Sequence, residues 1–191
     1  YVTKICFGLS VAQKYFSFIH NDLHSDNIMF KPCELEYKYY QFGKNYFKVP
    51  TFQRETKIID FARGILQVSN KTYFSDVFKN EGDAGGQYKY LQNKKNKKYN
   101  FHFDLARLAT TITEFVDNKM ELREIMHLLK QWTLNKNGDS FLEMDDDFSL
   151  YVMIAETANN ALPKEQINHR IFTEFQIKKS DIPKKSHIYT Y

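Results

Sequence analysis

The side chains best suited to carry out a reaction lie in two short segments. Residues 20–27 read His-Asn-Asp-Leu-His-Ser-Asp-Asn, and residues 58–61 read Ile-Ile-Asp-Phe and include Asp60. A carboxylate can take a proton from a hydroxyl group, and carboxylate and amide oxygens are the ligands that Mg²⁺ prefers. Phosphoryl transfer from ATP needs a base for the acceptor hydroxyl and oxygen ligands that hold the metal against the phosphates. The two segments therefore predict this class of chemistry.

Short apolar elements on either side must hold these segments in place. Apolar residues recur at helical spacing over residues 4–18, which predicts a helix that leads directly into the first segment. Residues 28–30 and 57–61 are short apolar runs of the kind that form strands, and Lys31-Pro32 ends the first of them. The tyrosine-rich insert between the runs, residues 34–54, is expected to form a β-hairpin extension.

The second half of the chain is expected to be mostly helical. Residues 68–100 have no regular pattern, and several glycines interrupt them, so they are interpreted as a long loop. Apolar residues return at helical spacing over residues 103–116 and 120–132, and a last helix is expected over residues 148–160. The residues that follow form a polar tail with little patterning.

Composition and charge narrow the class of protein. The chain has 191 residues, 42% of them hydrophobic, which suffices for one globular domain with its own core. The 27 basic and 23 acidic residues are spread along the chain and leave a formal charge of +4, which does not favour a specific nucleic-acid partner. No apolar stretch is long enough to cross a bilayer, so no membrane partner is expected. Cys6 and Cys33 form neither a metal-ligand pair nor a disulfide framework, which favours a reducing, intracellular location such as the cytoplasm.

The order of these motifs is similar to that of the protein kinase superfamily. In that superfamily a catalytic loop runs His-x-Asp and then four residues to an Asn, and the following strand leads to Asp-Phe-Gly. In detail the chain resembles the atypical protein-kinase-like proteins of giant DNA viruses. The likeness extends through residues 82–84, 87–88 and 103–108 and covers most of the chain. It implies the C-terminal lobe of a kinase: an α+β fold, mainly α-helical, with a small β-hairpin that carries the catalytic and metal-binding loops.

The resemblance assigns four residues to the reaction. Asp22 is expected to be the catalytic base, and Asn27 and Asp60 are expected to bind Mg²⁺ and, through it, ATP. His24 stands where many protein kinases have a lysine that touches the transferred phosphate, and an imidazole can serve there. The implied cofactors are ATP and Mg²⁺, and the implied acceptor is a serine or threonine of a protein. In a virus, such an enzyme would act in the host cytoplasm or in the virion.

Three further residues are implied as structural support. His20 is expected to bond to the backbone near Asp60, Phe61 belongs to the metal-binding motif, and Asp104 is expected to brace the catalytic loop from a later helix. The chain departs from the family pattern at Ala62, where the family has glycine. Asp60 also follows Asp22 by 38 positions, a long spacing for which the tyrosine-rich insert accounts.

The groups that hold ATP in a complete kinase precede the catalytic loop. Only 19 residues precede His20, and Gly8 is the one glycine among them, so no glycine-rich loop is present there. We therefore expect a C-terminal lobe over residues 1–175, without its nucleotide-binding N-terminal lobe, and a polar tail over residues 176–191. Because the sequence opens with Tyr1 rather than Met, it is expected to be a fragment that transfers phosphate weakly or not at all by itself.

Alternatives to a protein kinase remain open at this point. A pseudokinase acting as an interaction module would keep most of these motifs, and small-molecule kinases use a similar His-x-Asp-Leu-His loop. His20, Asp22 and His24 alternate, so on a strand they would face one way and could bind zinc, as in a metal hydrolase. A basic, tyrosine-containing stretch could instead form an interaction surface or select acidic substrates. Its residues are Tyr88, Tyr90, Lys94, Lys95, Lys97, Lys98 and Tyr99.

Overall fold

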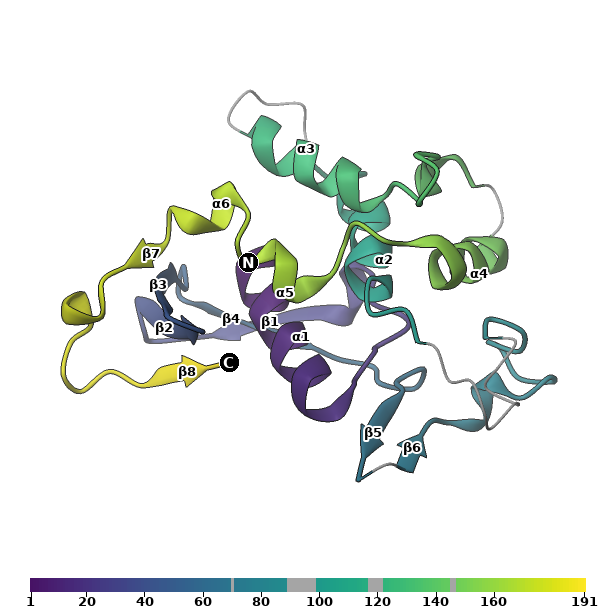
Figure 1. Ribbon diagram of the computed structural model, residues 1–191, viewed down its shortest axis with the longest axis horizontal. Helices are drawn as coiled ribbons and strands as arrows, with labels where there is room; N and C mark the ends of the chain where they lie inside the picture. The colour runs from purple at the N-terminus through teal and green to yellow at the C-terminus, as the bar shows by residue number, and fades with distance from the viewer. Residues whose placement is uncertain (70, 89–98, 117–121, 145–146) are drawn as a thin grey trace.

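The computed structural model has a mixed α+β fold (Figure 1). Three of the longer helices gather at one end of the molecule, a sheet of short strands lies at the other end, and the first helix lies between them. Two further pairs of strands form narrow antiparallel ribbons. The residues described are 1–69, 71–88, 99–116, 122–144 and 147–191.

The central helix, α1 (Val2–Phe16), delivers the chain to the first candidate segment. It ends at Phe16, and Ser17 follows in a left-handed conformation with a φ of 43°, which turns the chain so that the Phe18 N–H bonds to the Ala12 carbonyl oxygen at 3.4 Å. Ile19 and Ile65 then exchange two backbone hydrogen bonds of 2.9 Å, which anchor the start of the loop. The helix predicted over residues 4–18 is confirmed, with both ends two residues earlier.

A two-stranded antiparallel ribbon connects the two candidate segments. It consists of β1 (Ile28–Pro32) and β4 (Arg54–Ile58), and Ile28 pairs with Ile58. The residues after β4 therefore return to the end of the first segment. The strand predicted over residues 28–30 is confirmed, but it continues through Lys31 and Pro32, which were expected to end it. The strand predicted over residues 57–61 is misplaced. β4 stops at Ile58 because Asp60 has a positive φ of 59°, which lies outside the strand region.

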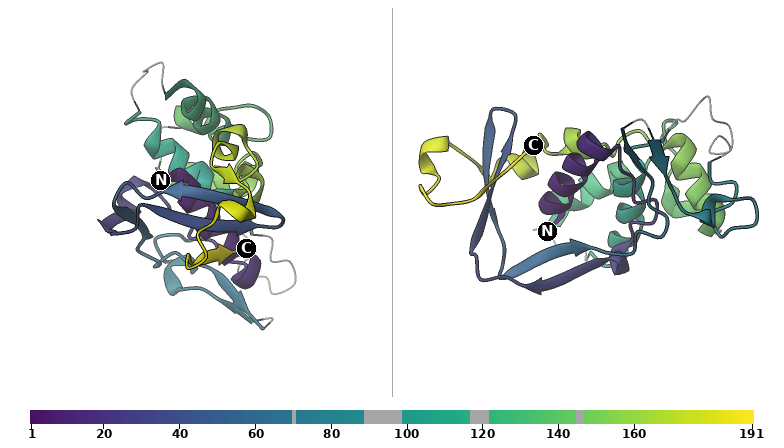
Figure 2. Two further views of the ribbon diagram at one scale, coloured as in Figure 1. Left: turned by 90° about the vertical axis from the view of Figure 1, so that its left-hand side faces the viewer. Right: turned by 90° about the horizontal axis from the view of Figure 1, so that it is seen from below.

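The tyrosine-rich insert forms the β-hairpin predicted for it. β2 (Tyr37–Phe42) and β3 (Asn45–Pro50) pair in antiparallel fashion around a tight turn, where Gly43 has a φ of 59°. Such a backbone conformation suits glycine, which has no Cβ. Figure 2 shows this hairpin at one end of the molecule, where the β1–β4 ribbon leads into it.

The residues expected to form a polar tail add strands to this hairpin. β7 (Gln176–Ile177) pairs antiparallel with β3, and β8 (Ile188–Thr190) pairs parallel with β2, which gives the strand order β7-β3-β2-β8. A short 3₁₀ turn, η5 (Lys179–Asp181), lies between the two strands. Strands of two or three residues are too short to leave a periodic pattern in the sequence. The boundary at residue 175 between lobe and tail stays a prediction.

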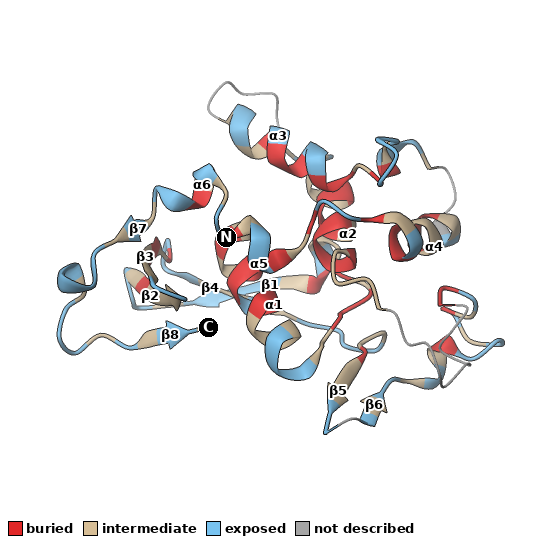
Figure 3. Cartoon of the chain, viewed as in Figure 1, coloured by how far each residue is buried: buried red, intermediate tan, exposed pale blue. Residues whose placement is uncertain are grey.

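The helical end of the molecule is built from α2 (Phe103–Ile112), α3 (Arg123–Trp132) and α4 (Asp147–Thr157). Two one-turn helices, α5 (Pro163–Gln166) and α6 (Arg170–Thr173), follow them, and α5 packs against α1. Buried residues concentrate on α1 and α2 (Figure 3). No helix in the described part of the chain is long and apolar enough to cross a bilayer.

These helices match the predicted ones in type and differ at their ends. The helices predicted over residues 103–116 and 148–160 are confirmed, but they stop at Ile112 and Thr157. The third, predicted over residues 120–132, runs from Arg123 to Trp132, and residues 120–121 lie outside the described part. A 3₁₀ turn, η4 (Phe141–Glu143), precedes α4.

The stretch expected to be one long loop contains some regular structure. β5 (Leu66–Val68) pairs with β6 (Lys71–Tyr73), and a 3₁₀ turn, η2 (Asp76–Phe78), follows. A Cβ on Gly82 would lie 2.4 Å from the Val77 carbonyl oxygen, so this tight turn requires glycine. Most of the basic stretch considered as an interaction surface lies outside the described residues, namely Tyr90, Lys94, Lys95, Lys97 and Lys98.

An aromatic cluster attaches the hairpin to α1. The Phe7 ring stacks on the Tyr40 ring at 4.5 Å between centroids and meets the Phe47 ring edge-on at 5.3 Å. Phe47 is 1% exposed, so this contact belongs to the core and not to the surface. The insert is therefore part of the packed structure.

We expect Phe47→Ala to lower the free energy of unfolding by about 3–5 kcal/mol, because it leaves a cavity between the hairpin and α1. The matched control is Phe52→Ala in the same insert, where the side chain is 65% exposed, and its effect should stay within about 0.5 kcal/mol. Urea unfolding of both variants checks this. Equal effects would show that the hairpin does not share the core.

A carboxylate surrounded by lysines connects the hairpin to the ribbon. Glu55 of β4 accepts a hydrogen bond from Lys38 of β2, and its other oxygen lies 3.1 Å from Lys57 Nζ and 3.4 Å from Lys31 Nζ. The hydrogen bond from Lys38 and the neighbouring positive charges lower the pKa of Glu55 to about 2. The folded state therefore favours the charged form of this side chain.

Because this pKa is depressed on folding, Glu55 should stabilise the fold above its ordinary pKa of about 4.5, and the effect should be lost as the pH falls towards about 2. We expect Glu55→Gln to be destabilised relative to the wild type at pH 7 and much less so at pH 3. Urea midpoints at the two pH values measure this, with Glu114→Gln as an exposed control. A difference that did not depend on pH would contradict the prediction.

Candidate active site

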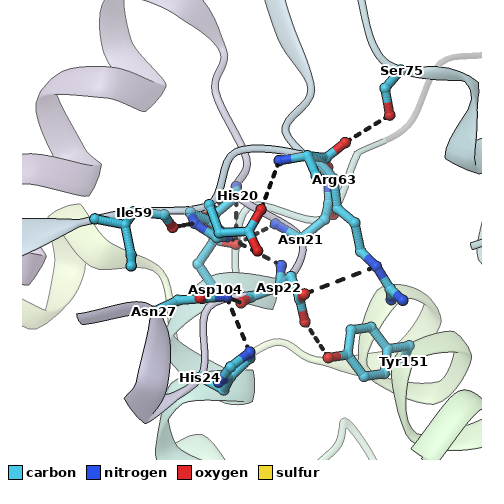
Figure 4. A network of polar contacts seen from close by, with 12 residues as sticks. His20, Asn21, Asp22, His24, Asn27, Ile59, Arg63, Ser75, Asp104 and Tyr151 are labelled. Carbon is cyan, nitrogen blue, oxygen red and sulfur yellow. Dashed lines mark hydrogen bonds and ion pairs between the residues drawn. The ribbon is translucent and has the colours of Figure 1, made fainter. Parts of the chain in front are cut away.

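The loop with the candidate catalytic residues is fixed from below by one buried carboxylate (Figure 4). Asp104, in the first turn of α2, accepts hydrogen bonds from His20 N at 2.9 and 3.1 Å and from Asn21 N at 3.0 Å. Its side chain is fully buried, and this burial raises the pKa of Asp104 against the opposing effect of the two N–H donors and of His20. These hydrogen bonds connect α2 to the backbone of the loop, and the bracing role implied for Asp104 stays a prediction.

His20 links the loop to the second candidate segment. Its Nδ1 accepts a hydrogen bond from Asp22 N at 3.3 Å, and its Nε2 lies 2.8 Å from the Ile59 carbonyl oxygen. A carbonyl oxygen can only accept, so the tautomer with its proton on Nε2 satisfies both contacts. This places the His20 ring against the backbone immediately before Asp60, and the structural role that the resemblance implies for His20 stays a prediction.

Asn27 lies where the two candidate segments meet. The Asn27 side-chain amide donates to the Asp22 carbonyl oxygen at 2.8 Å and to His24 Nε2 at 3.0 Å. The backbone oxygen of Asn27 accepts from Ile59 N at 3.0 Å, which brings Asn27 beside the residue that precedes Asp60. Both amide protons are thus engaged, and within the described residues the Oδ1 atom has no hydrogen bond. This oxygen is available to a cation.

The Asp60 side chain is exposed, and a local backbone turn determines its position. It adopts a left-handed conformation, and its carboxylate accepts a hydrogen bond from Ala62 N at 3.3 Å. The Ala62 carbonyl in turn accepts from Ser75 Oγ at 2.6 Å. Alanine in place of glycine is therefore compatible with a defined turn after Asp60.

The Asp22 carboxylate is engaged on one oxygen. Its Oδ1 accepts a hydrogen bond from the hydroxyl of Tyr151 on α4, and its Oδ2 lies 3.9 Å from Arg63 Nε. About 20% of the side chain remains exposed. Asp22 is thus fixed in orientation and still reachable from outside, as a base that acts on a bound substrate must be.

Two predicted residues have environments that the sequence did not indicate. His24 uses Nε2 to accept from Asn27, and its Nδ1 lies 3.9 Å from Asp26 Oδ2, so the ring is turned towards its own loop. The Phe61 ring lies 5.4 Å from the His20 ring and 5.9 Å from the Phe18 ring between centroids, yet 56% of it is exposed. The contact of His24 with a phosphate stays a prediction.

The zinc alternative depended on a strand that is not present. Residues 20–24 form an irregular loop, and His20, Asp22 and His24 bond to separate partners instead of converging on one point. No group of three or more His, Cys, Asp or Glu side chains in the described ranges is arranged to hold a metal ion. A Mg²⁺ site that uses one carboxylate, one amide oxygen and substrate phosphates does not need such a group.

Comparison with known proteins finds two relatives that are named as kinases. Over 84 residues, which are 43% of this chain and 15% of the relative, the chain is 32% identical to "Probable kinase 098L" of Invertebrate iridescent virus 3. Over 147 residues, which are 72% of this chain and 20% of the relative, it is 25% identical to "Serine/threonine-protein kinase haspin" of Mus musculus. The chain is distantly similar to protein kinases. It spans 15% and 20% of these two relatives, and no protein-family model matches it.

Sequence reasoning missed three residues of this site: Asn21 fills the variable position of the first motif, and Arg63 and Tyr151 lie outside both motifs. Asn21 has a φ of 62°, donates to the Arg63 carbonyl oxygen at 3.1 Å and accepts from the Tyr88 hydroxyl. Arg63 could have been found from the sequence, because it follows Asp60 by only three positions and must therefore lie near the site. Tyr151 had none, because it lies 129 positions from Asp22 in a helix with no recognisable motif.

We expect Asp104→Asn to lower the free energy of unfolding by about 2 kcal/mol or more, because the amide leaves at least one buried N–H of the loop without its acceptor. The control is Asp26→Asn, the same chemical change on a side chain in the same loop that is 88% exposed, which should leave stability unchanged. Denaturant unfolding compares the two. A loss of equal size in both would mean that Asp104 does not support the loop.

Proposed function

We propose that this chain provides the catalytic base and the metal ligands for ATP-dependent phosphorylation, with a serine or threonine of a protein as acceptor. The observation that carries the proposal is the pair of hydrogen bonds made by Asn27. One holds the backbone of Asp22, and the other holds the backbone next to Asp60. These hydrogen bonds hold the candidate base close to the candidate metal ligands, and phosphoryl transfer requires that both act on the same phosphate group.

In this proposal Asp22 orients the acceptor hydroxyl and takes its proton. A bond forms between the hydroxyl oxygen and the γ-phosphorus of ATP, the bond from that phosphorus to the β-γ bridging oxygen breaks, and ADP leaves. The fixed orientation and partial exposure of the Asp22 carboxylate support this role.

Asn27 Oδ1 and the Asp60 carboxylate are the atoms proposed to hold Mg²⁺. Both groups provide hard oxygen ligands. The amide N–H groups of Asn27 already donate to other partners, and the Asp60 side chain is exposed, so the residues fit the ion. A bound Mg²⁺ supplies positive charge that neutralises the phosphate oxygens during transfer. His24, near Asn27, is proposed to lie close to the transferred phosphate.

Protein acceptors are favoured over small molecules by one finding. The mouse relative is named a serine/threonine-protein kinase, and its similarity extends over 72% of this chain. We also propose that ATP is held largely by groups outside the 191 residues. Supporting this, Gly8 lies within α1, where it cannot form a phosphate-binding loop.

The test measures phosphate transfer from ATP and Mg²⁺ to generic protein substrates by the product of the complete reading frame that encodes this chain. We expect serine and threonine phosphorylation, and a loss of at least about a hundredfold in Asp22→Asn, since general-base catalysis contributes about 10²–10⁴. Asp26→Asn is the matched control and should keep full activity.

Each other outcome points to a different function. A folded wild-type protein without transfer would favour a pseudokinase. Transfer to small hydroxyl compounds but not to proteins would favour a small-molecule kinase. Activity that survives in Asp22→Asn would remove Asp22 from the role of base.

A further inference from the structure

Tyr151 is brought to Asp22 by the packing of α4 over the catalytic loop (Figure 4). Its hydroxyl donates a hydrogen bond to Asp22 Oδ1 from a position 129 residues later in the chain. The side chain has a single polar atom, and that atom is directed at the proposed base. A tyrosine needed only for core packing could be a phenylalanine at this position.

The Tyr151 ring is itself held tightly. The guanidinium carbon of Arg63 lies 4.8 Å from the ring centroid, and that of Arg107 lies 5.1 Å from it. The Phe103 ring of α2 lies 5.9 Å away between centroids, and Tyr151 as a whole is 8% exposed. A phenol fixed by three neighbours can transmit its position to the carboxylate to which it bonds.

Tyr151 also remains a donor at working pH. Burial and the hydrogen bond to Asp22 raise the pKa of Tyr151, and the nearby Arg107 opposes them with a smaller effect. Two cations beside a phenol would by themselves favour the phenolate, but here the desolvation and the neighbouring carboxylate outweigh them. The hydroxyl proton therefore stays on Tyr151 when Asp22 is charged.

The two carboxylate oxygens of Asp22 therefore differ in their hydrogen bonding. Oδ1 accepts the phenolic hydrogen bond, whereas Oδ2 lies 3.9 Å from Arg63 Nε, beyond hydrogen-bond distance. Within the described ranges, no hydrogen bond to Oδ2 is present. We propose that Tyr151 is a positioning residue that anchors Asp22 by Oδ1 and leaves Oδ2 as the atom that accepts the substrate proton.

This inference rests on the proposed phosphoryl transfer and adds to it a residue outside the kinase motifs. The proton of the acceptor hydroxyl moves to Oδ2 as the new phosphorus–oxygen bond forms, and the Tyr151 proton stays where it is. Arg63 lies on the Oδ2 side, with its Nε 3.9 Å from that oxygen. Positioning of this kind acts on the chemical step, because a displaced base lowers the fraction of bound substrate in a reactive geometry.

The first experiment is Tyr151→Phe in the product of the complete reading frame. This change removes one oxygen atom and keeps the ring beside the two guanidiniums. We expect kcat to fall by about tenfold or more, with KM for ATP within about twofold of the wild-type value. The control is Tyr15→Phe, the same change on an α1 side chain that is 59% exposed, and it should leave both parameters unchanged.

A second experiment measures the contact without using activity. Denaturant midpoints of the 191-residue wild type, Asp22→Ala, Tyr151→Phe and the double variant form a double-mutant cycle. If the hydrogen bond exists, the double variant should be less destabilised than the sum of the two single changes. Additive losses would show that the two side chains are not coupled and would overturn the inference whatever the activity.

The remaining outcomes separate the inference from the function on which it rests. If the wild type transfers phosphate and Asp22→Asn does not, but Tyr151→Phe has the wild-type kcat, only the positioning role is overturned. A rise in kcat in Tyr151→Phe would also overturn it, because the phenol would then compete with the acceptor for Asp22. If the folded wild type transfers no phosphate, the proposed function and the inference both fall.

Discussion

Asp104 places a carboxylate beneath a turn of backbone that has an unfavourable conformation. Asn21 in that turn has a φ of 62°, a left-handed conformation that few residues other than glycine, asparagine and aspartate adopt. The carboxylate accepts the N–H groups of His20 and Asn21, so donors that would be buried without partners are satisfied. The direction in which the loop presents its side chains is thus decided by a charge 84 residues further along the chain.

The site above this carboxylate is assembled from four separate parts of the chain. The loop provides Asp22 and Asn27, the turn after β4 provides Asp60 and Arg63, and α2 and α4 close it from the other side. A backbone hydrogen bond from Ile59 to Asn27 and the His20 side chain connect the first two parts. The side chains of Asp104 and Tyr151 connect the loop to the helices. The geometry of the site therefore depends on the packing of the helices as well as on the loop.

The sequence predicted those helices and strands that leave a local pattern of residues. Apolar periodicity predicted α1, α2 and α4 to within a few residues, and the tyrosine-rich composition of the insert predicted its hairpin. Prediction from the sequence failed where a long-range contact decides the outcome. β4 ends before Asp60 because of a backbone conformation that no pattern announces, β7 and β8 are too short to detect, and Tyr151 meets Asp22 only in three dimensions.

The parallel pairing of β8 with β2 bears on how the chain is made. Residues 188–190 cover an edge that residues 39–41 expose as soon as the hairpin forms. At about 5–20 residues per second, a ribosome needs roughly 7–30 seconds to add the intervening residues. During that time β2 presents unpaired backbone groups and tyrosine rings to other nascent chains, a situation that favours intermolecular strand pairing. Late pairing of β8 therefore leaves this edge of the hairpin uncovered during most of the synthesis of the chain.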